Sequence, residues 1–127
     1  MKRIAIIFLI ALTGCSTMHQ AKAPAGRVNH IVLCWLKDSG NARQRQQIID
    51  ASKTFRKIPS VLDVRVGETL GGGDRKIVDS SFDVAITISF ADAQGLADYV
   101  VHPIHEKARD EILIPILKKV VVYDFKE

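Results

Sequence analysis

The side chains best suited to chemistry lie in one short segment, residues 98–105, which holds a tyrosine and two histidines. His102 and His105 are three positions apart, a spacing able to bind a metal ion. No cysteine or group of carboxylates completes a ligand set around them, so the sequence predicts no metal and no other cofactor. The charged residues interspersed with this segment, among them Lys107 and Arg109, lie at helix-surface spacing and are expected to form a solvated face.

The glycine run Gly71-Gly72-Gly73 is a second feature with chemical potential, because glycine-rich loops can cradle phosphate groups. A phosphate-binding loop of the Walker type ends in Gly-Lys-Ser/Thr and opens a helix. Here Arg75-Lys76 leads towards another strand. The run is therefore predicted to be part of a hairpin loop.

The start of the chain has the pattern of an export signal. Lys2 and Arg3 precede an uninterrupted apolar run at positions 4–12. This run suits the apolar region of a signal peptide, about 7–15 residues, and is too short for a membrane-spanning helix, which needs about 20. The tetrapeptide Leu12-Thr13-Gly14-Cys15 that follows resembles the lipobox of bacterial lipoproteins.

The lipobox resemblance implies that cleavage leaves Cys15 first and that Cys15 carries the acyl chains of a membrane anchor. Ser16 stands where an aspartate would retain a lipoprotein in the inner membrane. The expected location is therefore the cell envelope, on the periplasmic face of the outer membrane in a Gram-negative host. A plain secretory peptide cut near Ala21 or Ala23 is the alternative, as is a soluble protein with a misread start.

These signals divide the chain into a signal peptide (residues 1–14), a lipidated cysteine with a flexible tether (15–27) and one folded domain (28–127). Loss of Lys2 and Arg3 lowers the formal net charge from +4 to +2. No remaining basic cluster is interleaved with aromatic residues, so no nucleic-acid partner is expected. Cys34, the other cysteine, lies in an apolar run and is expected to be a small buried hydrophobe.

The sequence of the domain predicts a series of strands and helices. Period-two alternation or continuous β-branched runs predict strands, and period 3.6 with capping residues predicts helices. The expected strands are residues 28–36, 61–70, 82–90 and 119–125, and the expected helices are residues 42–57, 91–101 and 104–113, the last ending before Pro115.

The order β-α-β-β-α-β predicts an α+β domain of the ferredoxin-like type, with helices on one face of an antiparallel sheet. Phe82, Val84, Ile86 and Ile88 form a strongly apolar stripe on the third strand. We expect this stripe to lie on the other face of the sheet, which must also be buried. With no further helices available, a second copy of the sheet is the natural cover, so the sequence predicts a homodimer.

The domain resembles the stress-responsive A/B barrel (Dabb) family along its whole length. The residues that carry the resemblance are His30-Ile31-Val32-Leu33, Ile58-Pro59-Ser60-Val61, Val66-Gly67, Phe82-Asp83-Val84-Ala85 with Phe90, residues 98–105 and Val122-Tyr123-Asp124-Phe125. The tyrosine followed by His-Pro-x-His is the most specific part. The resemblance implies a dimeric α+β barrel in which two sheets pack face to face.

The family includes a polyketide cyclase of the olivetolic acid type, which closes its product by aldol condensation. Its catalytic histidine and tyrosine correspond by position to His105 and Tyr99, and a pocket histidine corresponds to His30. An imidazole can remove a proton next to a carbonyl, and a phenol can hydrogen-bond the developing oxyanion. The cyclase has a histidine where this chain has Val84, so its pocket polarity is not reproduced. Val84 and Ile86 are expected to line the pocket with His30.

Two functions stay open at this point. The first is a non-enzymatic, membrane-anchored homodimer that binds a small apolar ligand or serves the envelope. In it His105 bonds a backbone carbonyl at the helix break and Tyr99 anchors a helix to the sheet. The alternative is a cyclase-like enzyme that uses His105 and Tyr99 for proton abstraction.

Overall fold

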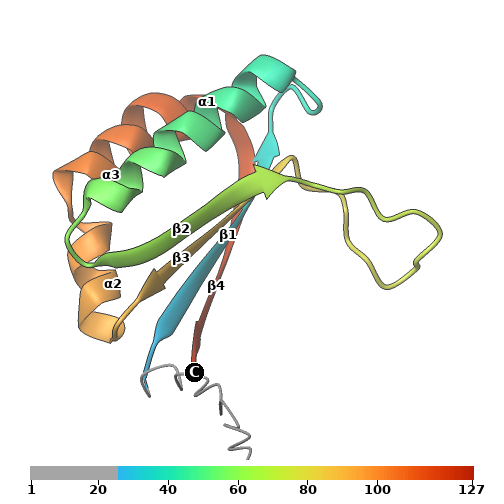
Figure 1. Cartoon of the computed structure of the whole chain (residues 1–127). Helices are drawn as coiled ribbons and strands as arrows, with labels where there is room; N and C mark the ends of the chain where they lie inside the picture. The colour runs from blue at the N-terminus through green and yellow to red at the C-terminus, as the bar shows by residue number, and fades with distance from the viewer. Residues whose placement is uncertain (1–25) are drawn as a thin grey trace, which may run out of the picture.

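The computed structural model describes residues 26–127, which form a four-stranded antiparallel sheet with helices on one of its faces (Figure 1). Cys15 and the rest of the predicted leader lie outside the described residues. The strands are β1 (Val28–Leu36), β2 (Val61–Glu68), β3 (Val84–Phe90) and β4 (Leu117–Lys126). The helical segments are α1 (Ala42–Lys53), η1 (Thr54–Lys57), α2 (Ala93–Val100), α3 (Pro103–Ala108), η2 (Arg109–Leu113) and α4 (Ile114–Ile116).

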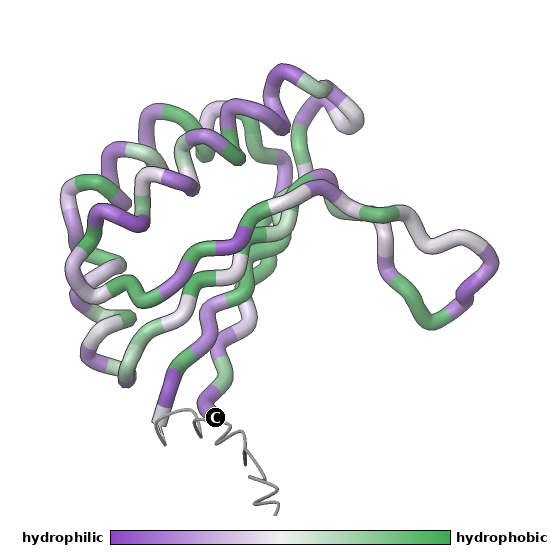
Figure 2. The backbone as a smooth tube through the Cα atoms, in the orientation of Figure 1, coloured by the Kyte–Doolittle hydropathy of each residue, from purple (hydrophilic) through white to green (hydrophobic). Residues whose placement is uncertain are grey.

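The strands lie side by side in the order β2-β3-β1-β4, and each neighbouring pair is antiparallel. This order confirms the predicted ferredoxin-like α+β fold. Figure 2 shows the helices alternating between hydrophobic and hydrophilic residues, as expected when a helix buries only one side.

The predicted orientation of β3 is wrong. Val84, Ile86 and Ile88 are at most 1% exposed in a single protomer, where they share the core with residues of the covering helices such as Ile48 and Phe55. They therefore face the helices and not a second sheet. Alternation separates a strand into two faces, but it does not say which face the helices cover.

The opposite side of the sheet nevertheless has an apolar region, which β1 and β4 supply. Their alternate residues point away from buried neighbours such as Val32 and Cys34. Tyr123 and Phe125 are about half exposed, at 58% and 48%. We call this surface the open face and define it by Ile31, Leu33, Trp35, Val121, Tyr123 and Phe125.

Side-chain caps fix where the helices begin. Asn41 accepts a hydrogen bond from the Gln44 amide (3.0 Å) before α1, and Asp92 accepts one from the Gly95 amide (2.9 Å) before α2. The His102 imidazole accepts from the Ile104 amide (3.2 Å) before α3. His102 is therefore a helix cap, a role that explains its place directly before a proline.

The last helical segment runs past its predicted end at Leu113. A π-helical turn, η2, precedes Pro115, and one more helical turn follows as far as Ile116. Proline cannot donate to the carbonyl four residues before it, and a widened turn is one way to accommodate that loss. Among the described residues, no helix is long and apolar enough to cross a membrane.

Candidate functional site

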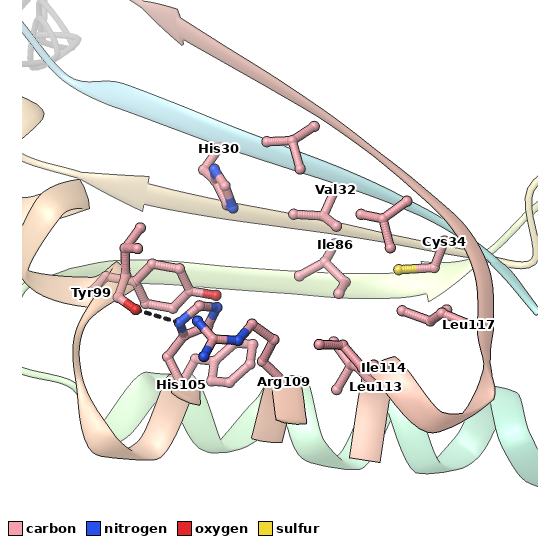
Figure 3. A pocket seen from close by; sticks show the side chains of 14 residues that line it. His30, Val32, Cys34, Ile86, Tyr99, His105, Arg109, Leu113, Ile114 and Leu117 are labelled. Atoms are coloured by element: carbon pink, nitrogen blue, oxygen red, sulfur yellow. Dashed lines mark hydrogen bonds between the residues drawn. The ribbon is translucent and has the colours of Figure 1, made fainter. Parts of the chain in front are cut away.

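A cavity of about 390 Å³ lies between the sheet and the segment α3-η2-α4 (Figure 3). Its walls are mainly aliphatic, and its polar groups come from two histidines, one tyrosine and one arginine. The lining residues are His30, Val32, Cys34, Phe55, Ile86, Tyr99, Val100, His105, Arg109, Leu113, Ile114, Leu117, Val120 and Val122. The cavity is formed within one protomer and not between two sheets.

His105 is held by a backbone carbonyl. Its Nδ1 lies 2.9 Å from the carbonyl oxygen of Val100, at the break between α2 and α3. Because a carbonyl only accepts, Nδ1 carries the hydrogen and Nε2 keeps its lone pair. This contact is the one expected if His105 has a structural role, and it fixes the tautomer of the neutral ring.

Burial lowers the pKa of His105, although its hydrogen bond to Val100 acts in the opposite direction. The positive charge of Arg109 lowers the pKa further. The ring is therefore neutral near pH 7. A neutral imidazole with a free Nε2 can accept a hydrogen bond or take up a proton.

Tyr99 lies beside His105 in a cluster of aromatic rings. The two ring centres are 4.3 Å apart, and the rings of Phe55 and Phe90 lie 5.5 and 5.3 Å from that of Tyr99. Burial raises the pKa of Tyr99, whose residue is only 2% exposed, so the phenol stays neutral. In Figure 3 the hydroxyl points towards the His105 ring at one end of the cavity.

His30 approaches the cavity from the sheet, and Asp124 holds its ring. The two residues are direct neighbours on β1 and β4, and His30 Nδ1 lies 2.6 Å from an Asp124 carboxylate oxygen. In the neutral ring the carboxylate accepts the Nδ1 hydrogen, which leaves Nε2 as the acceptor. His30 is also in edge contact with Tyr99, with ring centres 5.8 Å apart.

Arg109 is the one charged side chain that lines this cavity. The sequence placed it on a solvated face, and its side chain is indeed 39% exposed, but part of it also lines the cavity. Its Nε and one terminal nitrogen bond the Asp110 carboxylate at 2.7 and 3.0 Å. The available signal was its spacing of four from His105, which places both residues on one side of a helix.

The structure brings together four of the predicted site residues, His30, Ile86, Tyr99 and His105. Val84 is fully buried in the core and does not line the cavity, so the pocket role predicted for it is not supported. Asp124 was not predicted as a site residue, because its role depends on strand pairing between distant segments. Within residues 26–127, no group of three or more His, Cys, Asp or Glu side chains could hold a metal ion.

This architecture is that of a ferredoxin-like α+β domain with a cavity between its sheet and its helices. The sequence profile of the Stress responsive A/B Barrel Domain family (Dabb) matches residues 28–127, and the chain belongs to this family. No curated protein sequence matches the chain significantly.

Solved structures share the fold. A dimeric ferredoxin-like protein of unknown function from Thermobifida fusca YX is 24% identical, with a TM-score of 0.68, over 84% of this chain and 96% of its own. Hydroxynitrile lyase from Passiflora edulis is 24% identical, with a TM-score of 0.70, over 82% of this chain and 95% of its own. A Dabb family protein from Mesorhizobium loti is 20% identical, with a TM-score of 0.66, over 80% of this chain and 97% of its own.

Proposed function

We propose that this chain is a membrane-anchored homodimer in which each protomer binds a small, largely apolar molecule bearing a carbonyl or hydroxyl group. The observation that carries the proposal is the cavity, with aliphatic walls and its polar groups gathered around Tyr99. Binding pockets typically combine apolar walls with a few placed polar groups and span about 300–1,000 Å³. A volume of about 390 Å³ favours a small ligand.

The polar groups define what the ligand must offer. The Tyr99 hydroxyl can donate to a carbonyl oxygen, and the free Nε2 atoms of His30 and His105 can accept from a hydroxyl. Aliphatic residues at the other end, such as Leu117 and Val120, suit a hydrocarbon chain. The ligand class is therefore an amphipathic molecule with one compact polar head.

Binding can be tested with octanal, octanol and octane as probes, measured by calorimetry and by thermal shift. We expect octanal and octanol to bind more tightly than octane, because only they satisfy the polar groups. Val122→Trp should abolish binding by filling the cavity that Val122 lines, whereas Val101→Trp, on an exposed residue outside the cavity, should not. The proposal would be contradicted if none of the three probes binds, or if they bind Val122→Trp as tightly as the unaltered protein.

Proton abstraction next to a carbonyl is the second candidate function. The specific observation is the tautomer of His105, whose Nε2 is free while its Nδ1 is bonded to Val100. In this step Nε2 takes the proton from the α carbon, and the Tyr99 hydroxyl stabilises the enolate oxygen that forms. The similarity to a hydroxynitrile lyase shows that an enzyme exists on this fold, not that this chain is one.

The two functions can be separated by exchange of α hydrogens of octanone in deuterated water, followed by NMR. An enzyme would accelerate exchange, and both His105→Gln and Tyr99→Phe would reduce it strongly. We expect no acceleration by the unaltered protein, in line with the binding function. A clear acceleration that His105→Gln removes would establish the second candidate instead.

The homodimer is proposed to form through the open face. Leu33 and Trp35 at its centre are half-buried in one protomer, while Tyr123 and Phe125 are exposed. An apolar sheet face of this kind is normally covered by another layer. Solved proteins of the same fold from Thermobifida fusca and Bacteroides fragilis are dimeric, which supports the same assembly here.

The anchor is proposed from the sequence of residues 1–15 alone, with Cys15 as the lipidated residue and the outer membrane as its destination in a Gram-negative host. Cys15→Ser should abolish labelling by radioactive palmitate and leave the precursor uncleaved. Cys34→Ser is the matched control and should be labelled normally. A Cys15→Ser protein that is still labelled and still partitions into detergent would contradict the anchor.

A further inference from the structure

The loop between β2 and β3, residues 69–83, exposes two large aliphatic side chains almost completely. Leu70 is 96% exposed and Ile77 is 98% exposed, more than any other large hydrophobic residue in the described part of the chain. Figure 2 shows a hydrophobic stretch at the outer part of this loop, next to hydrophilic residues. Neither side chain contributes to the core or to the cavity, so stability of the protomer does not explain them.

The loop contains turns of its own. The Arg75 amide donates to the Gly72 carbonyl (3.3 Å), and the Val78 amide donates to the Arg75 carbonyl (3.1 Å). Gly71 and Gly73 have φ angles of 83° and 54°, in the left-handed region that glycine adopts without strain. The glycine run thus has a conformational role, shaping the loop that presents Leu70 and Ile77.

The base of the loop is continuous with the open face. Trp35, an open-face residue, donates from its indole nitrogen to the Ser81 hydroxyl (3.0 Å), and its ring meets Phe82 edge-on. Figure 1 shows the loop projecting well beyond the end of the sheet, away from the helices. A second sheet packed on the open face would therefore lie next to this loop.

We propose that residues 69–83 form an arm that packs Leu70 and Ile77 against the second copy of the chain in the homodimer. This inference rests on the proposed homodimer and adds a segment that contacts the partner.

A membrane surface is a less suitable partner for Leu70 and Ile77. Within residues 69–83, three aspartates (Asp74, Asp79 and Asp83) outnumber Arg75 and Lys76, so the arm lacks the basic excess that anionic lipids attract.

Sedimentation equilibrium of residues 26–127 tests the arm. This segment holds the whole described core and contains residues 28–127, over which the family profile matches, so it should fold alone. In the double variant Leu70→Ser/Ile77→Ser we expect the dimer dissociation constant to rise about tenfold or more, because two apolar side chains lose their contacts. Val101→Ser is the matched control, because Val101 is 67% exposed at the end of α2 and lies outside both the open face and the loop, and it should dimerise normally.

The outcomes separate the arm from the homodimer. A double variant that dimerises as tightly as the unaltered protein overturns the arm and leaves the homodimer standing. An unaltered protein that stays monomeric at a concentration of roughly tens of micromolar overturns both the arm and the homodimer. Folding is not in question for these variants, since both side chains are already in water, and circular dichroism should confirm unchanged spectra.

Cross-linking gives a second readout. Ile77→Cys labelled with benzophenone-maleimide should yield a covalent dimer on illumination, and Val101→Cys should not. Cys34 will not compete for the label, because it is buried and its burial raises the pKa of its thiol to about 12. Absence of cross-linked dimer from a labelled, dimeric Ile77→Cys protein would overturn the arm.

Discussion

At the scale of single residues, the site shows how two hydrogen-bonded imidazole rings give a defined polarity to an apolar cavity. Val100 and Asp124 each occupy one ring nitrogen, on His105 and His30 respectively, and so leave the other nitrogen free. The same arrangement serves ligand binding and proton transfer, and only the reactivity of the ligand distinguishes them. Because both anchoring groups are remote in sequence or part of the backbone, composition and spacing could not reveal them.

The depressed pKa of His105 predicts a pH-dependent stability. Below about pH 6.5 the unfolded chain takes up a proton at this position while the buried ring does not, so the folded state loses stability as the pH falls. This loss ends once the pH drops below the folded pKa. His105→Gln removes the titration, so its Tm should depend less steeply on pH between roughly 7 and 5 than that of the unaltered protein.

Thermal denaturation at several pH values measures this difference, since contributions from other groups cancel in the comparison. His102→Gln is the matched control, because His102 caps α3 and does not line the cavity. Parallel pH profiles for His105→Gln and the unaltered protein would show that burial of His105 does not influence folding.

At the scale of elements, the sequence was sufficient for the number, order and type of strands and helices. Strong alternation identified β3, and the turn and capping residues that end at Asn41 identified where α1 begins. The second helix begins at Ala93 and not at the predicted residue 91, because Asp92 caps it. The sequence was insufficient wherever both sides of an element are apolar. The stripe of β3 was assigned to the wrong face for this reason. The end of the helical segment after His105 was missed for a different reason: a π turn accommodates the hydrogen bond that Pro115 cannot make, so the segment continues past the proline.

The connection between β1 and α1 depends on one buried carboxylate, that of Asp83. It is 5% exposed and accepts hydrogen bonds from the Leu36 amide (2.9 Å), the Gly40 amide (2.8 Å) and the Ser39 hydroxyl (3.2 Å). Asp83→Asn should lower the free energy of unfolding by about 1.5–3 kcal/mol, the usual range for hydrogen bonds to a charged group. Urea denaturation measures the change. Asp63→Asn is the control, because Asp63 belongs to an exposed ion pair with Arg65, and we expect it to lower the free energy of unfolding by less than about 1 kcal/mol.

The same carboxylate should make the stability of the protein fall at low pH. Burial alone would raise the pKa of Asp83, but the hydrogen bonds from Leu36, Gly40 and Ser39 and the charge of Arg45 together lower it. Its contribution is therefore present above about pH 4 and is lost as the pH falls through the folded pKa. Asp83→Asn and the unaltered protein should accordingly converge in stability towards low pH. A gap that stays constant down to pH 2 or so would show that the charge is not what stabilises this connection.

At the scale of the whole molecule, the sheet separates two tasks. Its helix-covered side holds the cavity of one protomer, and its open face is the surface proposed for contact with a second copy. The same substitution should therefore have opposite consequences on the two sides. Ile86→Lys buries an unpaired charge in the core, where Ile86 is 1% exposed, and should prevent folding.

Leu33→Lys introduces the same charge on the open face, at the next position along β1 from buried Val32. A lysine there reaches water in the free protomer but not between two packed sheets, so the protomer should fold and remain monomeric. Circular dichroism reports the fold and sedimentation velocity the assembly. A folded Leu33→Lys protein that still forms the native dimer would show that the two copies meet elsewhere. Because Leu33 does not line the cavity, binding of octanol by the Leu33→Lys monomer would in addition show that each protomer holds a complete site.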